Sequence, residues 1–534
     1  MGSSAHLDRF VLDHLPPAAQ QPEFVFDLPE LAYPERLNAG VELLRRAIAA
    51  TGPDGRALID FDHEFSWARV DAISGRMARV LVEDMGLVPG NRVLLHGPNA
   101  SWTVLAWFAI LKAGGVVVAT MPMLRAAELA TVIDKARISH ALVYQTVADV
   151  VAEARETSPS LARVLDSAGL QQAAQALPPG FRFDAVDSAA DDPALIAFTS
   201  GTTGKPKGCV HFHRDILAMA DTFGRHVVGL TKDDIVVGTP PIAFTFGLGG
   251  LVVFPAAVGA ATAFAPQPGF EALAETVVRH RATAMVTAPT GYRALLKLAG
   301  DHDLSSLRTC VSAGEALPAA TSDAWHEATG VRIIDGIGST EMIHVFISAR
   351  GDAIRPGATG KAVPGYQACI IDADGKPLPA GETGRLAVRG PTGCRYLDDD
   401  RQAAYVRDGW NLTGDVYRLD EDGYFWFVAR SDDMIVSSGY NIGAPEVENA
   451  LLRHAAVAEA AVIGAPDEER GQICKAFVVL YPGIDPSPEL RAELQTFVKG
   501  VIAPYKYPRA LDFVESLPKT QTGKLQRFRL RETV

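Results

Sequence analysis

The sequence contains little cysteine, no excess of basic residues and no long apolar run. Its five cysteines, among 534 residues, are an odd number at wide spacing, which fits neither a disulfide framework nor a paired-cysteine metal site and is typical of a reducing cytoplasm. Lysine and arginine number 50 against 63 aspartates and glutamates, giving a net charge of −13. The basic surface of a nucleic-acid-binding protein is therefore not expected.

The apolar segments are too interrupted to predict a membrane span. Residues 102–121 and 250–266 are the most apolar, but each is broken by lysine, glycine or proline, whereas a span needs about 20 consecutive apolar residues. The first residues, MGSSAHLDRF, contain no apolar signal core, and His6 stands where a myristoylation signal has serine or threonine. We therefore expect a cytoplasmic protein without a membrane span.

The chain does contain ample material for a large globular fold. Hydrophobic residues make up 48% and charged residues 21%, as in globular proteins, and the length exceeds that of one domain. Strand and helix patterns alternate between residues 91 and 313, which predicts parallel sheets with right-handed crossovers. The expected elements are strands at 91–96, 116–120, 283–287 and 307–312, and helices at 35–50, 66–85, 101–113 and 290–300.

The pattern changes twice toward the C-terminus. From about 359 to 428, short alternating strands with glycine turns predict a small antiparallel sheet or barrel. After Arg430 the chain restarts with elements expected at 445–454, 458–463, 474–480 and 487–500. We predict an α/β fold with a large N-terminal domain of stacked α/β layers, residues 1–430, and a small α+β domain, residues 431–534.

The stretch 199–208, TSGTTGKPKG, has the composition of a phosphate-binding loop. It follows the apolar run 194–198 and combines three glycines, four hydroxyls and two lysines. Glycines let backbone N–H groups approach an anion, hydroxyls donate hydrogen bonds, and lysines add charge. It is not a Walker A loop, because two residues separate Gly201 from Gly204 and a proline follows Lys205. An ordinary polar surface loop is the alternative.

Three further stretches suit the rest of a nucleotide. In 335–341, DGIGSTE, the two glycines allow close approach to a flat ring, Thr340 can bind an α-phosphate oxygen, and Glu341 can hold Mg²⁺. The stretch 312–316, SAGEA, follows another strand. Asp415 can accept hydrogen bonds from both ribose hydroxyls, and Arg430 can reach the same ring. Each alone also fits an ordinary turn.

These motifs resemble, in order, those of the adenylate-forming superfamily, which includes acyl- and aryl-CoA ligases, peptide-synthetase adenylation domains and luciferases. The resemblance extends over nearly the whole chain, with five motifs. It implies an ATP site formed by Thr199, Ser200, Thr202, Thr203, Lys207, Gly314, Glu315, Asp335, Gly336, Thr340, Asp415, Arg430 and Lys524. It also implies that Thr340, Glu341 and Lys524 are catalytic and that Glu341 is the metal ligand.

The resemblance assigns the small C-terminal domain a mobile role. Asp432 would be the hinge, while Gly439 and Tyr440 would line a CoA tunnel after the domain rotates. Lys524 lies in 518–524, PKTQTGK, and its ammonium can bridge the attacking carboxylate and the α-phosphate. A solvated lysine near the C-terminus is the alternative.

Within the superfamily the chain is similar to the benzoate and 2-aminobenzoate CoA ligases. The stretches PPIAFTFGLGG, 240–250, and GSTEMIH, 338–344, carry this similarity. Thr245-Phe246 stands where the benzoate enzymes tend to have Ala-Tyr, which favours the 2-aminobenzoate branch. The implied pocket consists of Phe244, Thr245, Phe246, Ala313, Gly338, His344 and Val345.

Histidines could also be structural. A satisfied core histidine is the alternative for His344. The triplet HFH at 211–213 has no third ligand nearby, so we interpret it as structural rather than metal-binding.

The sequence therefore predicts an ATP- and Mg²⁺-dependent ligase that converts an aryl carboxylate to aryl-AMP and then to its CoA thioester. An enzyme loading a separate carrier protein, and a catalytically silent nucleotide-binding protein, are the alternatives. We expect an aryl acid, ATP and CoA as small-molecule partners and no nucleic acid. A homodimer remains open beside a monomer.

Overall fold

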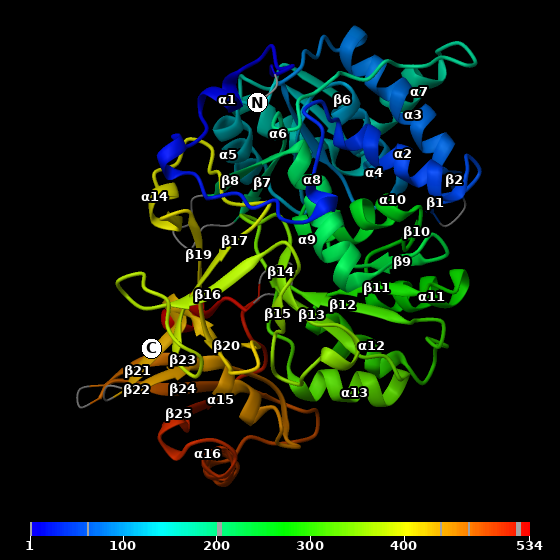
Figure 1. Ribbon diagram of the computed structural model, residues 1–534. Helices are drawn as coiled ribbons and strands as arrows, with labels where there is room; N and C mark the ends of the chain where they lie inside the picture. The colour runs from blue at the N-terminus through cyan, green and yellow to red at the C-terminus, as the bar shows by residue number, and fades with distance from the viewer. Residues whose placement is uncertain (1–2, 61–62, 200–205, 438–439, 468–469, 520–524) are drawn as a thin grey trace.

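The computed structural model describes residues 3–60, 63–199, 206–437, 440–467, 470–519 and 525–534. Within these residues the strands form four sheets (Figure 1). All five cysteines are among them, and each is a free thiol. No helix of the described ranges is both long and apolar enough to cross a membrane.

A nine-stranded sheet and a six-stranded sheet form the large N-terminal part. The nine strands, in spatial order, are β15 (Lys361–Ala362), β14 (Val345–Ser348), β13 (Ile333–Gly338), β12 (Thr309–Ala313), β11 (Ala284–Thr287), β9 (Ile235–Gly238), β10 (Ala261–Ala263), β1 (Arg56–Ile59) and β2 (Glu64–Ser66). The six are β6 (Arg163–Asp166), β5 (His140–Val143), β3 (Arg92–His96), β4 (Val116–Thr120), β7 (Pro193–Thr199) and β8 (Lys207–Phe212). Their inner strands pair in parallel, as predicted.

Two five-stranded sheets follow along the chain. The third contains β16 (Gln367–Ile371), β17 (Thr383–Arg389), β18 (Val406–Arg407), β19 (Trp410–Leu419) and β20 (Phe425–Arg430), and it is antiparallel. The fourth contains β21 (Met434–Ser437), β22 (Tyr440–Gly443), β23 (Val457–Asp467), β24 (Gly471–Leu480) and β25 (Ala510–Phe513). The short alternating strands that the sequence indicated beyond residue 359 form these two sheets.

Helices cover the sheets of the large N-terminal part. They are α1 (Phe10–Asp13), α2 (Ala39–Thr51), α3 (Trp67–Arg79), α4 (Ser101–Lys112), α5 (Ala126–Ala136), α6 (Ala148–Thr157), α7 (Ser167–Gln175), α8 (His213–Met219), α9 (Thr245–Leu248), α10 (Phe254–Val258), α11 (Phe270–His280), α12 (Pro289–Leu298), α13 (Ala319–Thr329) and α14 (Gln402–Tyr405). Three π-helical turns, η3 (Val80–Asp84), η5 (Ala220–Val228) and η6 (Gly249–Val253), extend α3, α8 and α9. The C-terminal sheet carries α15 (Ala444–Leu451), α16 (Pro488–Val501) and α17 (Arg527–Arg531).

Helix α4 forms the centre of the largest core. It is apolar on nearly all sides, and all its residues except the partly buried Trp102 are buried, as expected of a helix enclosed by other elements rather than lying at the surface. It packs against α2 and α3 and against strands β3 and β4. Lys112 ends this helix and donates to the Asp71 carboxylate at 2.6 Å. The long apolar stretch near residue 102 is therefore a core helix and strand.

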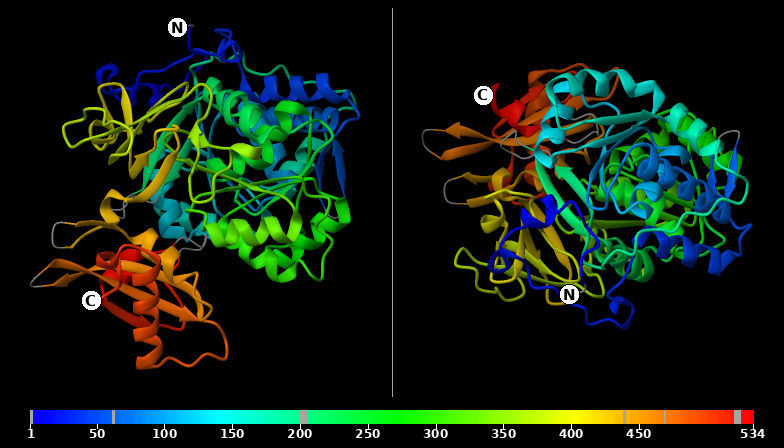
Figure 2. Two further views of the ribbon diagram at one scale, coloured as in Figure 1. Left: turned by 60° about the horizontal axis from the view of Figure 1, so that its bottom comes forward. Right: turned by 90° about the horizontal axis from the view of Figure 1, so that it is seen from above.

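The C-terminal elements form a separate lobe below the large part, coloured orange and red (Figures 1 and 2). The chain enters it through the single turn η8 (Ser431–Asp433) after β20. Helix α15 of the lobe contacts β20, and the approach is close because a Cβ at Gly443 would lie 2.3 Å from the carbonyl oxygen of Val428. This glycine permits the contact between the two parts.

The described architecture confirms the predicted fold class, including the small antiparallel sheet. The predicted strand 116–120 coincides with β4, and helix 101–113 with α4. Strand β10, of three residues, and strand β25 were not predicted. Both are too short for a period-2 pattern to be distinguished from a loop.

Candidate functional site

The predicted site residues gather where parallel strands end. Strands β12 and β13 are neighbours, with Ser312 opposite Asp335 and Ala313 opposite Gly336. Their carboxyl ends therefore bring the SAGEA and DGIGSTE stretches side by side. In open α/β sheets this edge is where ligands bind.

A strained turn after β13 directs the next side chains. Ile343 is completely buried and has a φ of 62°, a left-handed conformation that is an outlier for a β-branched residue. Its backbone N–H donates to Thr340 at 3.1 Å, and that of Met342 to Ser339 at 3.2 Å. The turn reverses the chain into β14, so that Glu341 and His344 face different surroundings.

Glu341 lies in a network with Lys207 and Tyr396. The Tyr396 hydroxyl donates to Glu341 Oε1 at 2.6 Å, and Lys207 Nζ donates to the same hydroxyl at 2.7 Å. Lys207 Nζ is also 3.3 Å from Glu341 Oε1. The structure thus brings the predicted phosphate lysine to the predicted metal carboxylate. Tyr396 was not predicted, because no motif surrounds it and its partners are distant in sequence.

His211 supports the backbone of the turn that contains Thr340 and Glu341. Its Nε2 lies 2.8 Å from the carbonyl oxygen of Thr340, and burial lowers its pKa to about 4. The ring is therefore neutral at pH 7, with the proton on Nε2 because a carbonyl only accepts. His213 instead accepts from the Ala39 N–H at 3.1 Å. No metal-binding cluster occurs among the described residues.

The predicted ribose pair is also assembled. Asp415 and Arg430 are directly opposite each other on β19 and β20, with Arg430 Nη1 donating to Asp415 Oδ1 at 2.9 Å. Burial raises the pKa of Asp415, and Arg430 opposes that shift. The arginine is half-exposed while the aspartate is buried, so the guanidinium covers the carboxylate from the solvent side.

Asp335 on β13 is a buried carboxyl with an unused oxygen. Burial raises its pKa to about 8, and its Oδ1 has no hydrogen-bond partner. At pH 7 the group is therefore mainly neutral, and it can both donate and accept a hydrogen bond. Such a group suits the edge of a nucleobase, where donors and acceptors alternate.

His344 sits in an aromatic enclosure. Its ring stacks on Phe223 at 5.3 Å between centroids and meets Phe254 edge-on at 4.7 Å and Phe246 at 5.8 Å. Burial lowers its pKa to about 3. The backbone of Phe246 lies close enough to favour the protonated ring slightly, but neither ring nitrogen makes a hydrogen bond. His344 is thus a buried ring whose nitrogens lack a well-formed hydrogen bond in this structure, and its assignment to the acid pocket stays a prediction.

Glycines make room for this ring. A Cβ at Gly249 would lie 2.4 Å from His344 Nε2, and one at Gly338 would lie 2.6 Å from the His344 carbonyl oxygen. The glycines of DGIGSTE are therefore required by packing against β14, in addition to any ligand. Gly338 remains exposed, which is consistent with an open approach at this point.

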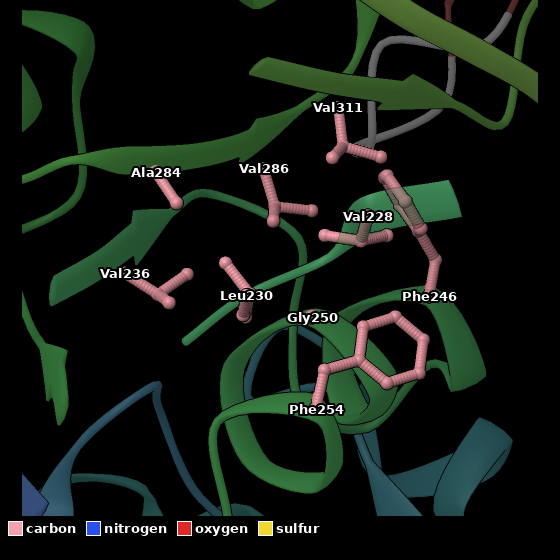
Figure 3. Close-up of a pocket in the computed structure, with 9 residues that line it drawn as sticks. All are labelled: Val228, Leu230, Val236, Phe246, Gly250, Phe254, Ala284, Val286 and Val311. Atoms are coloured by element: carbon pink, nitrogen blue, oxygen red, sulfur yellow. The ribbon is translucent and has the colours of Figure 1, made fainter. Parts of the chain in front are cut away.

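A small apolar cavity continues behind Phe246 (Figure 3). The centre of a water-sized sphere can occupy about 10 Å³ inside it. The cavity therefore has room for about one water molecule. Val311 and Val286 line it, two residues before the last residue of β12 and one before that of β11, respectively. Ala284 and Val236, near the first residues of β11 and β9, also line it, so the cavity extends away from the carboxyl ends of these strands and forms the deep end of the site. The lining residues are Val228, Leu230, Val236, Phe246, Gly250, Phe254, Ala284, Val286 and Val311.

The remaining predicted pocket residues lie on α9, β12 and β14 or next to these elements. Thr245, Ala313 and Val345 are buried, and Phe244 precedes α9, with its N–H donating to Pro241 at 2.9 Å. Gly314 follows β12 with a φ of 92°, a conformation that favours glycine. Glu315 comes next. Apart from Phe246, the predicted pocket residues do not line the deep cavity.

Several predicted residues lie outside the described part of the chain, namely Ser200, Thr202, Thr203, Gly439 and Lys524. Thr199 ends β7, and its Oγ1 is buried without a partner. Asp432 lies in the turn η8, and its side chain is not described. Tyr440 begins β22 and is largely exposed, with its ring 4.6 Å from that of Tyr505.

Comparison with known proteins identifies the family of the chain. The AMP-binding enzyme family matches residues 44–395, and the C-terminal domain of AMP-binding enzymes matches residues 446–524. The chain belongs to the AMP-binding enzyme family. It is thus an adenylate-forming enzyme of the acid–thiol ligase class, in the aryl-CoA ligase group.

Three relatives illustrate the group. The anthranilate CoA ligase AuaEII, solved with anthranoyl-AMP, is 36% identical, with a TM-score of 0.89 over 95% of this chain and 99% of that one. A benzoate CoA ligase from Burkholderia xenovorans LB400 is 32% identical, with a TM-score of 0.83 over 93% and 100%. The benzoate–CoA ligase of Thauera aromatica is 36% identical over 94% of this chain and 97% of its own.

The raised pKa of Asp335 predicts a stability change with pH. An unfolded aspartate ionises near pH 4, whereas folded Asp335 ionises near 8. The contribution of Asp335 to the free energy of unfolding is thus fully present below pH 4. It is lost as the pH rises to 8, because the unfolded carboxyl ionises first. We expect the thermal midpoint of the natural protein to fall relative to Asp335→Asn between pH 5 and 8. Asp303→Asn, at an exposed carboxyl whose pKa is lowered by its hydrogen bonds with Ser305, is the control. Parallel profiles for all three would contradict the assignment.

Because the nitrogens of His344 are unpaired, we predict that replacing this residue weakens binding of the carboxylic acid with little change in protein stability. His344→Leu removes two buried groups without partners, so the free energy of unfolding should change by less than about 1 kcal/mol. The KM for the carboxylic acid should nevertheless rise about tenfold, as expected when one good contact of roughly 1.4 kcal/mol is lost. His213→Leu is the matched control: it orphans the Ala39 N–H and should lower stability by about 1–3 kcal/mol without changing KM. Equal effects on stability from both variants would assign His344 a packing role.

Proposed function

We propose that the protein activates a small aromatic carboxylic acid, 2-aminobenzoate or benzoate, as its acyl-AMP and transfers the acyl group to CoA, releasing pyrophosphate and AMP. The observation that carries this proposal is His344, a neutral and unpaired ring inside an aromatic enclosure. It lies three residues from Glu341 in the same turn. A planar ring held there would place its carboxylate toward the nucleotide residues.

The residues around the strand ends suit the first half-reaction. Lys207 supplies a positive charge for phosphate oxygens, and Thr340 a hydroxyl for the α-phosphate. Mg²⁺ fits Glu341, because this carboxylate reaches the site edge and no described residue hydrogen-bonds its Oε2. Mg²⁺ would neutralise charge on the phosphates. We assign Lys524 to the bridge between the attacking carboxylate and the α-phosphate, and the ribose to Asp415 and Arg430.

The deep cavity supports small acids. Beyond Phe246 there is room for about one water-sized group, and every lining side chain is apolar. A ring with at most a small apolar substituent at its far end fits, whereas a long chain does not. The unpaired nitrogens of His344 can in turn accept or donate a hydrogen bond to a polar group on the ring, such as the amino group of 2-aminobenzoate.

We further propose that residues 1–430 and 431–534 act as two domains with the hinge at Asp432. After adenylation the small domain would rotate, replacing the Lys524 face with Gly439 and Tyr440 for CoA. A cytoplasmic location follows from the CoA and ATP requirement and from the five free thiols. Transfer to a separate carrier protein is the second candidate. Measuring thioester formation with CoA beside a carrier protein distinguishes the two acceptors.

A substrate screen tests the aryl assignment. Benzoate and 2-aminobenzoate should give the highest kcat/KM for pyrophosphate release, and octanoate should be poor, because the cavity beyond Phe246 does not admit a chain. Neighbouring aryl acids should differ by about ten- to two-hundred-fold at most, the usual value of a methylene-sized difference in an apolar pocket. Octanoate turning over faster than both aryl acids would overturn the assignment.

The two half-reactions test the role of Lys524. Lys524→Ala should reduce aryl-AMP formation by about a thousandfold, as loss of a transition-state charge contact does, while still converting supplied aryl-AMP and CoA to thioester. Lys519→Ala is the control, because Lys519 lies in the same segment and pairs with Glu459 at 2.6 Å. The measurement is single-turnover formation of each product. Equal losses in both steps would favour one fixed active site over two domain orientations.

A further inference from the structure

Tyr396 occupies a central position in the charged network of the site. Its hydroxyl donates to Glu341 Oε1 at 2.6 Å and accepts from Lys207 Nζ at 2.7 Å. Lys207 Nζ also lies 4.6 Å from the centre of the Tyr396 ring. The hydroxyl therefore uses its donor on the carboxylate and one acceptor position on the ammonium, and it links two oppositely charged groups.

The backbone fixes Tyr396 beside these groups. Leu397 N–H donates to Gly208 at 2.8 Å, and Val210 N–H donates to Arg395 at 2.8 Å. The segment thus pairs with β8, the strand that begins with Lys207. The N–H of Tyr396 donates to the side chain of Gln402 at 2.9 Å. Because its backbone is held on both sides, the tyrosine hydroxyl is a fixed point rather than a mobile one.

The two carboxylate oxygens of Glu341 have different hydrogen-bond partners. Both Tyr396 and Lys207 approach Oε1, whereas no hydrogen bond from a described residue reaches Oε2. Glu341 is buried, so the side chain cannot exchange its partners freely with water. One oxygen is anchored by the protein, and the other is left for a ligand.

We propose that Tyr396 is a positioning residue that anchors Glu341 through Oε1 and presents Oε2 to the Mg²⁺ of incoming Mg·ATP. In the nucleotide-free enzyme Lys207 compensates the charge of the carboxylate. When Mg·ATP is bound, Lys207 would turn from the carboxylate to the phosphates, and Glu341 would offer Oε2 to the metal. Tyr396 would keep its hydrogen bond to Oε1 in both states. This inference rests on one part of the proposed function, the binding of Mg·ATP. It does not depend on which carboxylic acid the protein activates.

The physical reason is that two opposite charges otherwise satisfy each other. Lys207 already contacts Glu341 Oε1 at 3.3 Å; without the hydroxyl between them this ion pair would tighten, and the carboxylate could turn either oxygen to the ammonium. The metal would then have to break that pair and order the carboxylate. Loss of a partner that orients a metal ligand commonly costs about 10- to 100-fold in metal affinity.

The experiment measures ATP binding by calorimetry with Mg²⁺ and with a chelator. In Tyr396→Phe the enhancement of ATP affinity by Mg²⁺ should fall about tenfold, while metal-free ATP binding should stay within about twofold. Tyr405→Phe is the matched control. Its ring lies 5.7 Å from that of Tyr396, and its hydroxyl is 3.4 Å from Ser339 Oγ, so it removes a neighbouring hydroxyl without a described bond to Glu341. Both variants keep the ring, and thermal unfolding checks the fold.

A double-mutant cycle assigns the effect to Glu341. In the Glu341→Gln background, Tyr396→Phe should not change the Mg²⁺ enhancement further, because the anchored charge is gone. An unchanged enhancement in Tyr396→Phe, or an equal loss in Tyr405→Phe, would overturn the inference while leaving the proposed ligase intact. If the natural protein bound no ATP under either condition, the proposed function would fail, and this inference with it.

Discussion

The reversal of the chain between β13 and β14 is the constraint on which the site depends. Ile343 is buried and left-handed, a strain of about 1–3 kcal/mol that persists only where the surroundings impose it. Gly338 leaves room for the turn, since a Cβ there would overlap the His344 carbonyl. The turn places Glu341 against Lys207 and His344 among aromatic rings. Because both side chains belong to one turn, the predicted nucleotide residues and the predicted acid pocket keep a fixed relation.

The local parts of this fold could be predicted from the sequence. Strand β4 (Val116–Thr120) and helix α4 (Ser101–Lys112) are encoded by continuous apolar residues between glycine breaks, so the order of strand, helix and strand was evident. The loops that end β12 and β13 were recognised because their glycines and hydroxyls are adjacent in sequence. Parallel pairing then brings these two loops together without further information.

What could not be predicted depends on contacts between distant segments. Tyr396 reaches Glu341 only because its segment pairs with β8, and no periodicity indicates that pairing. The sequence did not indicate that His211 on β8 contacts Thr340, a contact that joins this strand to the turn after β13. The ionisation of Asp335 follows from burial, which sequence composition does not reveal. Such properties arise from tertiary packing rather than local preference.

Several predicted site residues carry buried polar atoms without partners. Thr199 Oγ1, Asp335 Oδ1 and both nitrogens of His344 are buried without partners, although each such group typically costs about 1–3 kcal/mol. They come from β7, from β13 and from the turn that leads into β14, so no single packing defect explains them. Two of these residues lie at the predicted nucleotide positions, and the third lies at the predicted ring. A ligand that supplied the missing hydrogen bonds would recover that free energy only when bound in one orientation. The protein thus gives up stability at the positions where selective binding requires unsatisfied groups.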